Sequence, residues 1–145
     1  MRKNAFTLVE TVFAVSIFLI VTLSVYEGYS VLYSSLSLAH LKVVAASLVN
    51  ERFEIARNLP YTDVGIVNGN PSGKLIASQV LVRDGISWNV ETLVENIDDS
   101  FDGVSPIDIR PADYKLVEIT VACNTCKNFT PVKISGWIAP RNLEP

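Results

Sequence analysis

The stretch FTLVETVFAVSIFLIVTLSVY, residues 6–26, contains a single charged side chain, Glu10. Together with Ala5 it forms a run of 22 residues that is otherwise apolar or weakly polar. At about 1.5 Å per residue, a helix of this length crosses a hydrocarbon core of roughly 30 Å. We therefore expect residues 6–26 to form a membrane-spanning helix segment.

The charges on either side of this run predict its orientation. Arg2 and Lys3 precede it, whereas Glu27 follows it and the next Lys or Arg is Lys42. The positive-inside rule then places the N-terminus in the cytoplasm and the remainder of the chain across the membrane. A secretory signal peptide would have a shorter apolar region and a small-residue cleavage site after it. A plain single-span anchor is the simplest alternative, but it leaves Glu10 unexplained.

Glu10 is the anomalous residue of the apolar run. An acidic side chain at membrane depth costs about 2.5–3.5 kcal/mol on insertion scales, so it is a functional hypothesis by default. An opposite charge that neutralises the carboxylate would make its burial tolerable. Alternatively, the side chain reaches back to the cytoplasmic interface, because only a few residues separate it from the basic leader.

The first ten residues resemble the class III leader of type IV pilins and pseudopilins. A basic leader is followed by the small residue Ala5 and then by Phe6-Thr7-Leu8-Val9-Glu10. The resemblance implies that a prepilin peptidase cleaves between Ala5 and Phe6 and methylates the new amino terminus of Phe6. Ala5 stands where that family usually has Gly.

The resemblance also implies a function and a set of partners. The chain would be a minor pilin or pseudopilin of a type IV pilus, a type II secretion system or a DNA-uptake filament, with Glu10 paired to the amino terminus of a neighbouring subunit. Its partners would be other pilin-like subunits, the prepilin peptidase, an inner-membrane assembly platform and the membrane itself. It would be stored in a bacterial inner membrane and then enter a periplasmic or cell-surface filament. The alternative is a single-pass inner-membrane protein that never polymerises and carries a periplasmic binding domain.

The helical pattern continues beyond residue 26. No proline occurs before Pro60, so nothing forbids one helix from Phe6 to about residue 59. Gly28 and several serines weaken its middle, where we expect a bend or local melting. An apolar stripe at helix spacing, interrupted by Arg52, is expected to pack on a sheet; it comprises Leu41, Val44, Ala45, Leu48, Ile55, Ala56 and Leu59.

The period changes to two in the second half of the chain. Residues 75–83 and 86–94 predict two strands joined by the hairpin turn Asp84-Gly85. Two further strands are predicted at 115–123 and 132–139.

The expected fold class is therefore α+β, with a long N-terminal helix packed on a small antiparallel sheet of about four strands. Its predicted parts are a leader (1–5), a transmembrane or filament-core helix segment (6–26), an amphipathic continuation of the helix (27–59) and a periplasmic or extracellular β domain (60–145).

Two features of the β domain are candidate sites. Cys123 and Cys126 form a CxxC motif at a strand end, where a structural disulfide is the expected state outside the cytoplasm and a redox site is the alternative. Asp98, Asp99 and Asp102 precede Gly103 in a loop that is a weak candidate for calcium, the other interpretation being a solvated acidic turn.

Composition argues against several other functions. A net charge of −3 without a clustered basic stripe does not suggest a nucleic-acid partner. The only histidine, His40, is far in sequence from both cysteines. We recognise no nucleophile–base pair and no glycine-rich phosphate loop, and we expect neither enzymatic activity nor, apart from that calcium candidate, a cofactor.

Overall fold

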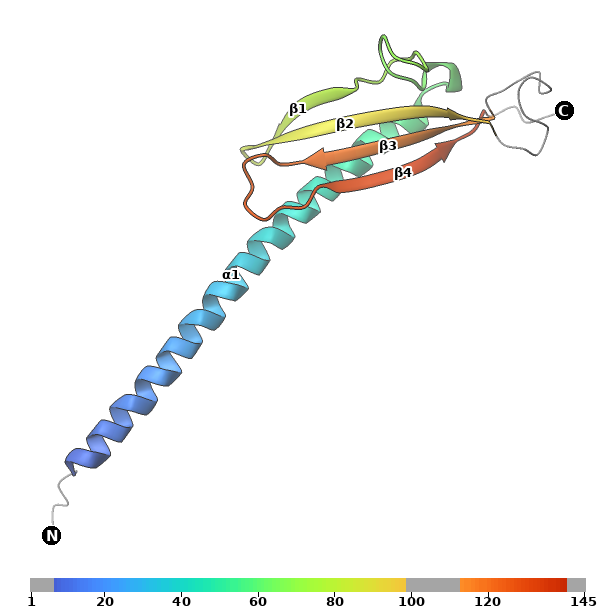
Figure 1. The fold of residues 1–145 in the computed structure, drawn as a ribbon. Helices are drawn as coiled ribbons and strands as arrows, with labels where there is room; N and C mark the ends of the chain where they lie inside the picture. Colours follow the sequence, from blue (N-terminus) through green and yellow to red (C-terminus); the bar gives the residue numbers. More distant parts are fainter. Residues whose placement is uncertain (1–6, 99–112, 141–145) are drawn as a thin grey trace. The chain divides into compact units, whose positions relative to one another are not determined.

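The computed structural model describes residues 7–98 and 113–140 (Figure 1). Within these residues one long helix is followed by an antiparallel four-stranded sheet, which confirms the predicted α+β class. The elements are α1 (Leu8–Asn58), the short 3₁₀ helix η1 (Tyr61–Asp63), β1 (Ser78–Arg83), β2 (Ile86–Ile97), β3 (Tyr114–Ala122) and β4 (Val132–Ile138).

Helix α1 is 51 residues long and begins and ends within two residues of the predicted bounds. Pro60 explains its end, because a proline disfavours helical geometry in the residue before it. The predicted local melting in the middle of the helix is wrong, since α1 is unbroken through Gly28 and the serines that follow. One glycine costs only about 1 kcal/mol relative to alanine in a helix interior, and the chain has no proline there.

The chain divides into two compact units between Ala39 and His40. Helix α1 contributes to both of them. The second unit contains the C-terminal part of α1 together with the whole sheet.

The sheet has the simplest order, β1-β2-β3-β4, and each strand pairs antiparallel with the next. The predicted turn between β1 and β2 is confirmed. Asp84 and Gly85 both have positive φ, 53° and 74°, as a two-residue hairpin of the favoured twist requires.

The predicted start of the first strand is wrong by three residues. Leu75 does not pair with β2; its N–H donates to the carbonyl of Gly65 at 2.8 Å, and it forms a bridge with Ile66. Leu75 therefore belongs to the loop after η1, and β1 begins at Ser78.

In the second unit, the C-terminal part of α1 lies across one face of the sheet (Figure 1). The predicted stripe supplies the helix side of the core, and the alternating residues of β2 and β3 supply the sheet side. Ile55 of the predicted stripe is 43% exposed, however, whereas Val49, which is not part of that stripe, is fully buried. The core residues of α1, β2 and β3 are Val44, Ala45, Leu48, Val49, Ala56, Trp88, Val90, Val94, Val117, Ile119 and Val121.

Lys115 is a charged residue on the inner face of β3. It is only 6% exposed, and its Nζ donates to the carbonyl oxygens of Tyr61 (2.9 Å) and Val64 (2.5 Å). The same ammonium lies 4.7 Å from the centroid of the Tyr61 ring. Burial lowers the pKa of Lys115, and the nearby Asp63 carboxylate opposes that shift. Lys115 thus links residues 61–64, which follow α1, to the sheet through two hydrogen bonds.

Gly136 of β4 faces the Cζ end of the Phe53 ring from α1. A Cβ at this position would clash with Cζ of Phe53, far inside van der Waals contact. The absence of a side chain at position 136 is therefore what allows the helix to approach β4.

We predict that Gly136→Ala lowers the free energy of unfolding by about 1–3 kcal/mol, the usual cost of an overpacked core. The measurement is urea unfolding of the detergent-solubilised chain, followed by the fluorescence of the buried Trp88. Gly28→Ala is the matched control, because a Cβ there meets nothing within 4 Å. Equal stability of Gly136→Ala and the wild-type chain would show that Phe53 moves aside at no cost.

Candidate functional site

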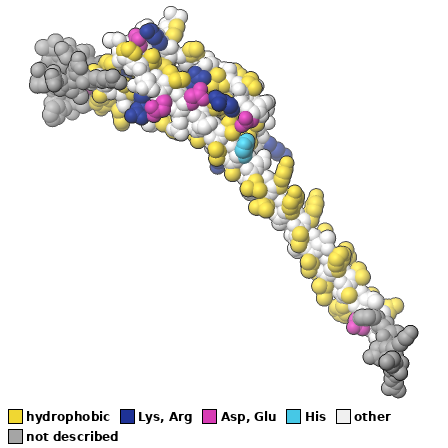
Figure 2. Space-filling view, turned by 180° about the vertical axis from the view of Figure 1, so that it is seen from behind, with side chains coloured by type: hydrophobic (Ala, Val, Ile, Leu, Met, Phe, Trp, Pro, Cys, Tyr) yellow, Lys and Arg dark blue, Asp and Glu magenta, His cyan; other side chains and the backbone are white. Residues whose placement is uncertain are grey.

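The surface of α1 from Leu8 to Leu36 is apolar and exposed. Figure 2 shows hydrophobic side chains over the visible face of this part of the helix. Their exposure leaves them without a partner among the residues that the structure describes. The large hydrophobic residues concerned are Leu8, Val9, Val12, Phe13, Val15, Ile17, Phe18, Leu19, Ile20, Val21, Leu23, Val25, Tyr26, Tyr29, Val31, Leu32, Tyr33 and Leu36.

The aliphatic hydroxyl groups in the first half of this surface are satisfied inside the helix. Between Leu8 and Tyr26 each Ser or Thr side chain donates to a main-chain carbonyl three or four residues earlier, at 2.7–2.8 Å. These residues are Thr11, Ser16, Thr22 and Ser24. A helix that already satisfies its backbone and its hydroxyls can enter a medium without water.

Among the described residues, α1 is the one helix whose length and apolar composition suit a membrane span. This finding supports a membrane anchor in general terms. The inner membrane and the orientation of the chain remain predictions.

Glu10 lies in the first turn of α1 and is exposed. Its backbone N–H donates to Oγ1 of Thr7 at 3.3 Å. No basic group among residues 7–98 and 113–140 approaches its carboxylate within 4.0 Å. The carboxylate is therefore not neutralised within this part of the chain.

Thr7 is a structural residue that sequence reasoning missed. Thr7 and Glu10 occupy the N-cap and N3 positions of α1, which is the spacing of a capping box. The structure forms one half of that box, the bond from Glu10 N–H to Thr7 Oγ1. The pattern Thr-x-x-Glu in front of an apolar run was the signal, and it gives Glu10 a local role besides any role in assembly.

Ala5 and Phe6 lie outside the described residues. Cleavage between them, methylation of Phe6 and pairing of its amino group with Glu10 all stay predictions.

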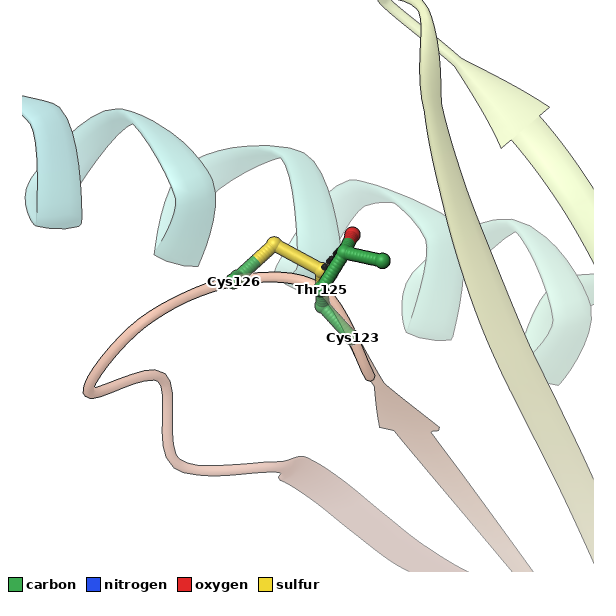
Figure 3. The surroundings of a disulfide bond; sticks show 3 residues. All are labelled: Cys123, Thr125 and Cys126. Atoms are coloured by element: carbon green, nitrogen blue, oxygen red, sulfur yellow. Dashed lines mark hydrogen bonds between the residues drawn. A yellow bond between two sulfur atoms is a disulfide. The ribbon is translucent and has the colours of Figure 1, made fainter.

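The predicted disulfide between Cys123 and Cys126 is present, with the two Cα atoms 5.4 Å apart (Figure 3). Cys123 is buried at the end of β3, and its Sγ lies 3.6 Å from Oγ1 of Thr125. The following loop turns back toward the core, where Phe129 packs edge-to-face on Trp88 with 5.3 Å between ring centroids. The disulfide thus closes a tight turn at the start of the β3–β4 connection.

The candidate calcium ligands of the β domain lie mostly outside the described residues. Asp98 follows the end of β2, whereas Asp99 and Asp102 lie outside the described residues, so the calcium prediction is untested. No cluster of three or more potential metal ligands occurs in the ranges 7–98 and 113–140.

The two tryptophans have different environments. Trp88 is fully buried, while Trp137 is 62% exposed and packs edge-to-face on Tyr114 with 4.9 Å between ring centroids.

No protein family matches the chain, and no characterised protein or solved structure is significantly similar to it.

We predict that the Cys123→Ser/Cys126→Ser double variant still folds and loses no more than about 2 kcal/mol of stability. The reason is that the disulfide joins residues three apart, and the chain entropy lost on closing so short a loop is small. Urea unfolding of the variant, compared with the oxidised wild-type chain that retains the disulfide, measures this loss. Complete unfolding of the variant would contradict the interpretation of the disulfide as a local clasp.

Proposed function

We propose that this chain is a structural subunit of a type IV-like filament, a minor pilin or pseudopilin that serves a pilus, type II secretion or DNA uptake. The observation that carries the proposal is the exposed apolar surface of α1. Its hydroxyls between Leu8 and Tyr26 are satisfied within the helix, and the carboxylate of Glu10 in its first turn has no cation within 4.0 Å among the described residues. The leader-like residues before it, Arg2 to Phe6, support the same assignment.

In this proposal α1 has two successive environments. The prepilin peptidase first removes residues 1–5 on the cytoplasmic side, while the apolar part of α1 holds the subunit in the bilayer. The assembly platform then moves the subunit into a bundle of equivalent helices. Because lipid is as apolar as the bundle, close side-chain packing and polar pairing must drive this step.

Glu10 supplies the polar pairing. Cleavage creates a positively charged amino terminus at Phe6, four residues before Glu10. In a helical stack the amino terminus of one subunit meets Glu10 of another, which neutralises both charges in a medium of low dielectric constant. A subunit in the wrong axial register would leave both charges unpaired, so the pair also selects the register.

The rival proposal is a single-pass inner-membrane protein that does not polymerise and binds a ligand in the periplasm. The observation in its favour is a cavity of about 490 Å³ at the end of α1. It is lined by residues 57–62 together with Ile138, Ala139 and Pro140. Under this proposal the leader is retained and Glu10 acts only as a helix cap.

The N-terminal residue of the membrane-derived protein separates the two proposals. We expect intact-mass and N-terminal analysis to find a chain that begins at N-methylated Phe6. The protein should be isolated from cells with an active prepilin peptidase, and a peptidase-deficient strain provides the control. A chain that retains residues 1–5 in both strains would exclude the filament proposal.

Glu10→Gln tests the charge separately from the cap. Glutamine at N3 still suits a capping box, but it cannot neutralise an amino terminus. We expect membrane insertion to be unchanged and incorporation into filaments to fall at least tenfold, because breaking a buried ion pair costs roughly 3–5 kcal/mol.

Quantitative immunoblotting of sheared filaments against whole membranes measures this ratio. Glu27→Gln, a loss of the same charge elsewhere on α1, is the matched control. Normal incorporation of Glu10→Gln would show that the carboxylate serves the helix cap alone.

A further inference from the structure

Arg52 is the charged residue that interrupts the apolar stripe of α1. Its side chain is only 24% exposed, and its nearest carboxylate is that of Glu51, at 3.8 Å. Glu51 is better satisfied by Arg83, whose guanidinium donates to its Oε2 at 2.8 Å. The side chain of Arg52 is thus largely buried, and its guanidinium has one long and shared ion pair.

The Nε–H group of Arg52 lacks a hydrogen-bond acceptor within the described part of the chain. The nitrogen is buried, and no described residue offers it an acceptor within hydrogen-bond distance. An arginine carries five N–H donors and cannot lose its charge. A buried cation with unused donors is costly unless an anion completes it.

A cavity of about 100 Å³ adjoins Arg52, well above the roughly 10–15 Å³ that one water molecule needs. Its polar lining consists of Arg52 and Lys74, which only donate hydrogen bonds, and of Gln79 and Thr92, which donate or accept them. No carboxylate lines it. Lys74 also pairs with Asp63 at 2.6 Å, which leaves Arg52 as the cation without a close partner. The remaining lining is apolar and consists of Ile55, Leu75 and Ile76.

We propose that this cavity is a binding site for a small carboxylate. Arg52 supplies the charge-assisted hydrogen bonds, Gln79 and Thr92 contribute neutral donors, and the aliphatic wall accommodates a short alkyl group on the carboxylate carbon. The mixture of donors and aliphatic side chains favours a carboxylate over an inorganic anion, which has no apolar part. The carboxylate comes either from a free small acid or from the side chain of an Asp or Glu in another copy of this chain. The site does not depend on the proposed filament function.

The test is an NMR titration of the full-length, ¹⁵N-labelled chain in a neutral detergent at pH 7. Sodium acetate replaces sodium chloride at constant ionic strength, and the Nε–H signal of Arg52 and the amide signal of Thr92 are followed. We expect both signals to shift saturably with acetate.

Arg52→Gln should weaken acetate binding at the Thr92 amide by at least about tenfold, because it removes a charge-assisted pair. Lys133→Gln is the matched control, since Lys133 is exposed and pairs with Glu118 on the outer face of the sheet. That variant should bind acetate as the wild-type chain does.

Raising the protein concentration without acetate distinguishes the two sources of the carboxylate. A shift of the Arg52 Nε–H signal that grows with protein concentration and is reversed by acetate would assign the ligand to another copy of the chain. A response to acetate alone would assign it to a free acid. If the wild-type signals respond to neither, or if Arg52→Gln responds to acetate as the wild-type chain does, the proposal is wrong.

Discussion

The fold depends on covering one apolar face of a single four-stranded sheet. An isolated sheet of this size is not stable unless its hydrophobic face packs against another element. In this protein the C-terminal part of α1 provides that cover, and the buried residues of β2 and β3 meet its stripe. Two details make the contact possible: Gly136 leaves room for the ring of Phe53, and Lys115 ties down the segment that follows the helix.

The same helix has a second surface of a different kind. From Leu8 to Leu36 its apolar side chains are exposed, while its backbone and the hydroxyls of its first half are satisfied internally. Such a surface is unfavourable in water and favourable in lipid or against other apolar helices. A continuous helix therefore joins a part that folds with the sheet to a part that calls for another environment, and this division underlies the proposed filament function.

Two charged residues on α1 stand where an apolar residue would be expected, and each is under-neutralised within the described chain. The backbone N–H of Glu10 binds Thr7, and no cation among the described residues lies within 4.0 Å of the Glu10 carboxylate. Arg52 has a long, shared contact with Glu51 and a buried Nε without an acceptor. Since an unpaired charge at low dielectric is costly, we expect both residues to bind a group outside the described chain. That group would be a cation for Glu10 and an anion for Arg52.

The sequence by itself determined the features that depend on local rules. The lack of proline before Pro60 predicted the extent of α1, alternation predicted the inner faces of β2 and β3, and Asp84-Gly85 predicted the hairpin. The CxxC motif of Cys123 and Cys126, with the predicted location outside the cytoplasm, likewise favoured their disulfide. Each of these follows from residues close together in the chain, so no knowledge of the tertiary contacts was needed.

Only the tertiary structure decided which residues meet across the sequence. Val49 is in the core while Ile55 is partly exposed, Leu75 belongs to the loop after η1, and Gly136 faces the end of the Phe53 ring. The cavity beside Arg52 is likewise a tertiary feature, because its lining comes from α1, the loop between η1 and β1, and strands β1 and β2. Periodicity shows which face of a helix or strand is apolar. The partner of each residue on that face is set by how the sheet packs on the helix, which is a property of the whole packed unit.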